Sequence, residues 1–444
     1  MLTDCLGNPV TLQDASSLGA VNDFVEGFIA CEARAVNVLK ISNADRSAIV
    51  QACCAALHMF AESPDAATNA RPFIDRALEA SAGATVRERR FVASVAAWVD
   101  GDITLAAALH EEQAHEFPRD LVSVKLGQYH RFNLGDSPGM LRLALSALPH
   151  AGDVPYLHGM AAFAWEQCHL LDQAEAAARQ GIAMCRKEPW AHHALAHVML
   201  TQGRISEGQA FMSDMSDTWR GLNSFMVTHN WWHQALFGLE LGQHDDVLRL
   251  YDERVWGVAK DYSQDQVNAI SLLSRLELCG VDVGQRWQGV ADFLLLRVDD
   301  HVLPFLDLHY LYGLARAGRP QADALMQSLS AFASDAARSS PVWGQVCLPA
   351  ARGLLAYVNG DFAAGATALG TALPRLAEIG GSHAQRDWFE QLYLDALMRS
   401  AQWSTAQQMV QQRLRGNPQS ARLKRHGAAI YAALGLPASI VSLT

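Results

Sequence analysis

The sequence predicts an all-α fold built from helical hairpins. Apolar residues recur at the i, i+3, i+4 and i+7 spacing of an amphipathic helix, in segments of about 12–16 residues. Short turns rich in Gly, Pro, Asp or Asn separate these segments. The alternating pattern of a half-buried strand is almost absent. These patterns indicate helices that pair through tight turns.

Four hairpins are clear, each with a first helix, a tight turn and a second helix rich in alanine. They cover residues 91–120, 156–189, 190–219 and 228–256, with turns at Gly101, His169-Leu170, Gly203 and Gly242. Looser hairpins follow at 309–335, 341–375 and 386–435.

The hairpins recur with a nearly constant period. Pro155 and Pro189 are 34 residues apart, and His193 and His229 are 36 apart. A period near 34, with small residues where paired helices cross, is typical of tetratricopeptide-like hairpins. One hairpin cannot bury its own apolar face, so stacking creates a continuous core and a concave surface lined by first helices. The sequence therefore predicts an α-solenoid, a helical superhelix whose ligands meet first-helix residues.

Residues 1–90 are also helical in pattern but show no clear repeat. We expect them to form an N-terminal helical segment packed on one continuous repeat domain, residues 91–444. The stretch 62–70 is the best loop candidate in this segment. Eight scattered cysteines, including the adjacent Cys53 and Cys54, are expected to be small buried residues of a cytoplasmic protein.

Composition excludes several classes of protein. Half of the 444 residues are apolar, which excludes intrinsic disorder. The net charge is −11 with only five lysines, so the chain is a poor counter-ion for phosphate and no nucleic-acid partner is expected. No apolar run is long enough to span a membrane, and no secretory signal is visible at the start.

The usual nucleotide and hydrolase motifs are missing as well. No G-x-G-x-x-G, Walker-type or G-x-S-x-G motif occurs, so we expect no nucleotide cofactor and no α/β-hydrolase chemistry.

The histidines are unevenly spread. Ten of the 17 lie between residues 158 and 309. Six of them fall on predicted first helices of successive hairpins: His158, His193, His197, His229, His233 and His309.

Two i, i+4 pairs stand out within this set. His193 and His197 share one helix face, as do His229 and His233. A step of 36 residues carries one pair onto the other, so the four imidazoles are expected to converge. They would then bind a divalent metal such as zinc, or line a metal-free pocket that shuttles protons. The structural alternative is that each histidine fills a half-buried position and bonds a backbone carbonyl.

A second constellation is GGSHAQRD at residues 380–387. Ser382 is expected to cap the following helix, with Gln385, Arg386 and Asp387 in its first turn. Arg386 would clamp a carboxylate with two hydrogen bonds. The structural alternative is a plain helix cap with an internal ion pair.

Seven motifs in order make the chain resemble the tetratricopeptide repeat protein 38 family over about residues 90–400. They are PRDLVSVKLGQYHRFNLGD (118–136), YLHGM, HHALAH, HNWWHQALFGLELG, GVDVGQRW, DLHYL and GGSHAQRD. The resemblance implies a tetratricopeptide-like helical superhelix whose biochemical activity is poorly defined. It supports as motif residues His193, His197, His229, Asn230, Trp232, His233, Asp307, His309, Gln385, Arg386 and Asp387. His158, His192 and His383 are not demanded by the family pattern, which concentrates attention on five histidines.

Two functions remain open at this point. The first is a small-molecule enzyme, for example a hydrolase, or a ligand-binding protein, with a histidine-rich pocket in the concave groove. Its expected catalytic residues are His193, His197, His229, His233 and His309, and its substrate-binding residues Asp307, Trp232, Gln385, Arg386, Asp387 and His158. If a metal is bound, its ligands are His193, His197, His229 and His233. The alternative is a peptide- or protein-binding scaffold without catalysis. A homo-oligomer is compatible with both.

Overall fold

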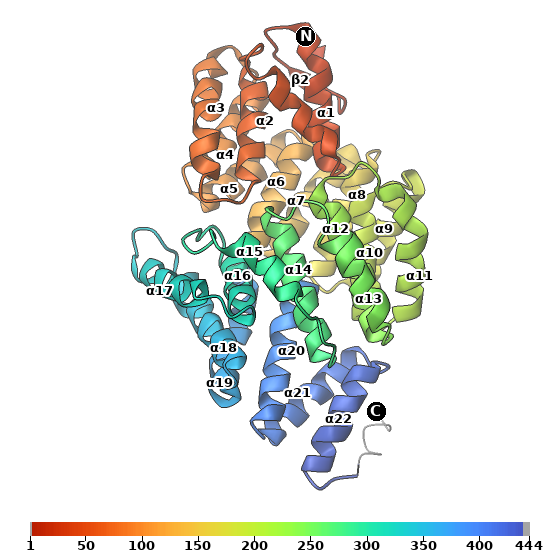
Figure 1. The fold of residues 1–444 in the computed structure, drawn as a ribbon. Coiled ribbons are helices and arrows are strands. Elements are labelled where there is room, and N and C mark those ends of the chain that lie inside the picture. Colours follow the sequence, from red (N-terminus) through yellow and green to blue (C-terminus); the bar gives the residue numbers. More distant parts are fainter. Residues whose placement is uncertain (1, 438–444) are drawn as a thin grey trace. The chain divides into compact units, whose positions relative to one another are not determined.

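The computed structural model describes residues 2–437, and within that range the fold is almost entirely helical (Figure 1). The only paired strands in that range are β1 (Leu2–Thr3) and β2 (Pro9–Val10), antiparallel with Leu2 opposite Val10. The predicted all-α class with tetratricopeptide-like hairpins is confirmed. No described helix combines the length and the hydropathy needed to cross a bilayer.

The chain divides into two compact units. Unit 1 extends to Leu195 and includes Met215–Val227, whereas unit 2 contains Ala196–Asp214 and continues from Thr228. Helices α10 (Pro189–Thr201), α11 (Ile205–Met215) and α12 (Ser224–Glu240) contribute residues to both. A boundary at residue 90, expected from the sequence, stays a prediction.

Unit 1 is a series of helices in which sequence neighbours pack together. Its helices are α1 (Leu18–Ile29), α2 (Ala48–Met59), α3 (Ala66–Ala80), α4 (Val86–Val99), α5 (Ile103–Glu116), α6 (Leu121–Asn133), α7 (Ser137–Ala151), α8 (Pro155–Gln167) and α9 (Leu171–Met184). Short 3-10 helices lie at Ala15–Ser17, Ala33–Ile41, Ser81–Gly83 and Ser216–Trp219.

Unit 2 repeats the pairing and also has contacts between alternate helices: α14 packs on α16, and α16 packs on α18. Its helices are α13 (His244–Leu250), α14 (Ser263–Leu278), α15 (Arg286–Leu294), α16 (Pro304–Arg316), α17 (Gln321–Ser334), α18 (Leu348–Val358), α19 (Phe362–Ala372), α20 (His383–Arg399), α21 (Trp403–Gly416) and α22 (Ala421–Ala433). Two π-helical turns (Tyr251–Val255, Trp343–Cys347) and one 3-10 helix (Leu373–Ile379) complete it.

Tight turns with left-handed backbone join the hairpins at the predicted places. Gly101 has φ 84°, and Asp102 directly after it caps α5 by accepting a hydrogen bond from the Leu105 N–H. A left-handed residue followed by an aspartate N-cap satisfies the free N–H groups of the second helix. His169 makes an equivalent turn without glycine, at φ 58°.

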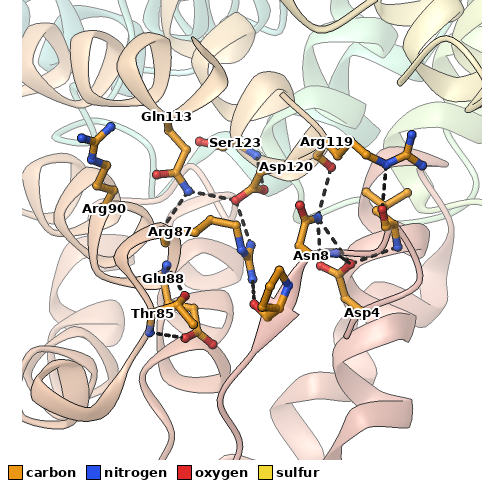
Figure 2. Close-up of polar contacts among 12 residues, drawn as sticks. Asp4, Asn8, Thr85, Arg87, Glu88, Arg90, Gln113, Arg119, Asp120 and Ser123 are labelled. Carbon is orange, nitrogen blue, oxygen red and sulfur yellow. Dashed lines mark hydrogen bonds and ion pairs between the residues drawn. The ribbon is translucent and has the colours of Figure 1, made fainter. Parts of the chain in front are cut away.

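The strand pair of unit 1 is fastened to the helices by a buried polar network (Figure 2). Arg87 on α4 pairs with Asp120 at 2.9 Å and donates to the Pro9 carbonyl at 3.0 Å. Gln113 on α5 also donates to Asp120, at 2.9 Å. Because every member of this trio is buried and bonded, the network stabilises one arrangement of β2, α4, α5 and α6.

Two expectations for the N-terminal segment, a loop and buried cysteines, can be compared with the structure. The loop expected at 62–70 is wrong in its second part, because α3 begins at Ala66. All eight cysteines are free thiols, and Cys53 and Cys54 lie buried on α2 as expected, but Cys5 is exposed and Cys168, Cys185 and Cys279 are only half-buried.

Candidate metal centre

Four buried histidines on α10 and α12 come together. One ring nitrogen from each of His193, His197, His229 and His233 lies within 4.8 Å of the others. Around a zinc ion at about 2.0–2.1 Å, tetrahedral nitrogen ligands are about 3.4 Å apart, so the ring nitrogens would have to come closer to one another to share an ion. The two i, i+4 pairs expected from the sequence supply these four residues, and a functional site formed by them stays a prediction.

Three of these histidines belong to unit 2 and contact one another directly. The rings of His197 and His233 are 4.5 Å apart between centroids, and those of His229 and His233 are 4.8 Å apart. Trp232 stacks on His229 with a centroid distance of 5.2 Å and an interplanar angle of 9°. The stacked indole limits the movement of the imidazole, which favours a preorganised site.

His193 lies one turn before His197 on the continuous helix α10. Its ring packs against Trp190 at 4.8 Å and Phe163 at 5.0 Å between centroids. These aromatic contacts lie within unit 1.

A neighbouring helix orients one of the imidazoles. Nδ1 of His229 is 2.9 Å from Oδ1 of Asn268 on α14, and an Nδ1–H that donates there leaves the Nε2 lone pair available. Asn268 in turn donates to Thr228 at 3.4 Å, and Thr228 donates to Asp265 at 2.8 Å. Such outer partners are typical of metal-ligating histidines, because they fix the tautomer and the ring orientation.

The electrostatics favour neutral imidazole. The pKa of His229 is lowered to about 3, mainly by burial; the hydrogen bond to Asn268 opposes this shift, and the nearby His197 adds a smaller lowering. A neutral ring is the form that coordinates a metal. The adjacent Asn230 is fully buried, and its side-chain amide has no hydrogen-bond partner in the described part of the chain.

His309, the fifth expected catalytic residue, is not in this group. Its ring packs on Trp388 at 4.6 Å and Phe305 at 4.4 Å, and Nδ1 donates to the Phe305 carbonyl at 2.7 Å. Burial lowers the pKa of His309 to about 3. These contacts match the structural alternative, in which a core histidine bonds a backbone carbonyl.

The other expected binding residues are placed separately. His158 on α8 bonds the Gly152 carbonyl at 2.9 Å, in unit 1. Trp232 donates from its indole N–H to Ser271 at 3.0 Å, and the Arg275 guanidinium lies 5.3 Å from its ring. Asp307 accepts a hydrogen bond from His301.

The GGSHAQRD segment forms the helix cap expected from the sequence. Ser382 accepts from the Gln385 N–H while the Gln385 side chain accepts from the Ser382 N–H, a capping box at the start of α20. Arg386 donates to the Gly381 carbonyl. Asp387 pairs with Arg413; burial raises its pKa, but the guanidinium groups of Arg413 and Arg275 outweigh burial and hold that pKa well below its usual range.

Sequence patterns gave no sign of Asn268. It lies on α14, which is absent from the predicted hairpins and buries polar as well as apolar residues. A single buried amide adds nothing to a periodic apolar signal.

No family model matches the chain. Among solved structures it is similar to the human IFIT1 dimer with PPP-AAAA, at 12% identity and a TM-score of 0.43, over 98% of this chain and 93% of that one. It is also similar to Naa15/Naa10 bound to HypK-THB, at 11% identity and a TM-score of 0.26, over 95% of this chain and 68% of that one. At these values neither likeness bears on function.

Proposed function

We propose that this protein binds one divalent transition metal, with zinc the first candidate, through His197, His229 and His233, and with His193 as the fourth ligand. The observation that carries the proposal is the group of four buried ring nitrogens within 4.8 Å. Imidazole suits zinc, copper and nickel, whereas calcium and magnesium prefer oxygen ligands.

The role of His193 decides what such a centre does. Zinc held by four protein ligands is closed and structural, whereas zinc held by three keeps a position for water and lowers the pKa of that water. A hydrolytic or proton-transfer reaction on a small molecule therefore requires that His193 stay outside the coordination shell. Of the proposed substrate residues, Trp232 lies against the cluster.

Metal analysis of untagged protein tests the proposal. We expect roughly one zinc per chain after reconstitution and dialysis. His229→Ala and His233→Ala lose that metal, whereas His115→Ala keeps it, because His115 is exposed on α5. Asn268→Ala is expected to weaken zinc about 10–100-fold in a chelator competition, since it orients His229 without touching the metal.

The same variants separate the two kinds of centre. If His193→Ala loses the metal as His229→Ala does, the centre is closed. If it keeps the metal, the open-site interpretation stands. Zinc below about one ion per ten folded wild-type chains would overturn the proposal.

A second candidate is a peptide- or protein-binding scaffold of the tetratricopeptide kind. The direct packing of the alternate helices α14, α16 and α18 favours it, because stacked first helices create a binding surface in such repeats. Fluorescence anisotropy with labelled acidic C-terminal peptides tests this function, with saturable binding as the expected result. We also propose that the protein belongs to the tetratricopeptide repeat protein 38 family, that it is cytoplasmic and that it forms a homo-oligomer.

A further inference from the structure

Outside the histidine cluster, a hydroxyl, an imidazole and a carboxylate lie in line within unit 2. Nε2 of His301 is 2.8 Å from Oγ of Ser328, and Nδ1 of His301 is 2.6 Å from Oδ2 of Asp307. His301 lies in the segment before α16, Asp307 in the first turn of α16 and Ser328 on α17. The two ring nitrogens thus face different partners from different elements.

Solvent exposure increases from Asp307 through His301 to Ser328. The side chain of Asp307 is 0% exposed and that of His301 is 6% exposed, whereas Ser328 is half-buried. A buried carboxylate holds a hydrogen on Nδ1, and the imidazole then presents the Nε2 lone pair to the more accessible hydroxyl. The hydroxyl is therefore the end that a small molecule can reach.

The imidazole is held firmly in this orientation. Its ring stacks on Phe332 at 4.7 Å and meets Trp343 edge-on at 6.0 Å between centroids. His301 also has φ 45°, a left-handed conformation that costs a non-glycine residue about 1 kcal/mol or more. Strain of this kind in a bonded histidine is more frequent at functional sites than elsewhere.

We propose that Ser328 is a nucleophile for acyl transfer from small activated esters, with His301 as its general base and Asp307 as the positioning residue. In the first step the Ser328 oxygen bonds to the carbonyl carbon, the hydroxyl proton passes to Nε2 of His301, and the ester C–O bond breaks. The same proton then goes to the departing alcohol oxygen. Water hydrolyses the acylated Ser328 by the reverse proton path and releases the acid.

Asp299 competes for the hydroxyl hydrogen. The Ser328 hydroxyl also donates to this carboxylate, which is exposed. While the hydroxyl donates to Asp299, its oxygen can only accept a hydrogen from Nε2 of His301, so the hydroxyl must turn from Asp299 to a free Nε2 before the imidazole can act as its base. Removal of this carboxylate leaves the hydrogen to His301.

Labelling of the folded full-length protein by an alkyl fluorophosphonate tests the proposal. In this reaction the Ser328 oxygen bonds to phosphorus and fluoride departs. We expect labelling of the peptide that contains Ser328, none in Ser328→Ala, and unchanged labelling in Ser330→Ala, whose hydroxyl only donates to the Met326 carbonyl. His301→Gln is expected to slow labelling by about 100-fold or more.

Two further variants separate this role from a purely structural hydrogen-bond chain. Asp299→Ala is expected to label faster than wild type, whereas loss of a structural bond would leave the rate unchanged or lower it. Asp307→Asn is expected to lower the maximal labelling rate without changing the probe concentration that gives half of it. No labelling of folded wild type, or an Asp299→Ala rate at or below wild type, would overturn the proposal.

Discussion

At the scale of single residues, this protein buries several ionisable side chains. Arg87, Glu188, Arg275 and Asp307 all lie out of solvent. A buried charge without a partner lowers the stability of the fold. The free energy of unfolding should therefore depend on whether each of these groups is neutral or paired with an opposite charge.

Glu188 provides a test through pH. Its carboxylate is fully buried and accepts from the Ala191 N–H at the start of α10, and burial raises its pKa to about 8. Below its ordinary value of 4.5 both folded and unfolded chains hold the proton; between 4.5 and about 8 only the folded chain does. Stability is therefore lost as the pH rises through this window, by up to about 1.4 kcal/mol per pH unit.

Glu188→Gln keeps the acceptor and removes the titration. Its free energy of unfolding in urea, relative to wild type, should increase from pH 5 towards pH 8, since only wild type is destabilised in that window. Parallel curves for the two proteins across this range would contradict the assignment.

The ion pair of Arg87 with Asp120 provides a second test at this scale. Arg87→Met leaves Asp120 buried without its charge partner, so we expect a loss of about 3–5 kcal/mol in unfolding free energy. Arg90 on the same helix pairs with Glu116 at 2.7 Å, but both side chains are partly exposed. Arg90→Met should therefore cost less than about 1 kcal/mol, and equal losses in the two variants would refute the distinction.

At the scale of elements, close helix crossings depend on glycine. A Cβ on Gly353 of α18 would lie 2.9 Å from the Leu369 nitrogen of α19, and backbone cannot move aside. Gly353→Ala is expected to cost about 1–3 kcal/mol in chemical denaturation. Gly289→Ala on α15 meets nothing within 4 Å and is the matched control, expected to gain up to about 1 kcal/mol. A neutral Gly353→Ala would show that the helices can separate freely.

The elements also show what a sequence can and cannot predict. Apolar periodicity and turn residues such as glycine were enough to predict most hairpins, because both signals are local in the sequence. They missed α6–α7 and α14–α15; in α14 the buried face includes Asp265, Asn268 and Arg275. The i, i+4 spacing pointed to the two histidine pairs, and their joint role as one site stays a prediction. It missed Asn268, His301 and Ser328, whose partners are set by tertiary contacts far apart in the chain.

At the scale of the whole molecule, the charge balance has a direct consequence. The net charge of −11 leaves little electrostatic attraction to a phosphate backbone. We expect no saturable binding of a labelled single-stranded RNA at about 0.15 M salt, with a dissociation constant no tighter than about 10⁻⁴–10⁻⁶ M. Anisotropy titration measures it, and a tight, salt-resistant complex would show that a local basic surface outweighs the net charge.

Most left-handed turns in this chain use glycine, but His169 at φ 58° and Ala401 at φ 57° do without it. At such positions a side chain imposes a conformational penalty of about 1 kcal/mol that glycine would not. Ala401→Gly is therefore expected to raise the melting temperature, because relief of this penalty outweighs the greater freedom of the unfolded chain. Substitution at such a turn would stabilise the protein against heat without changing the histidine cluster or Ser328.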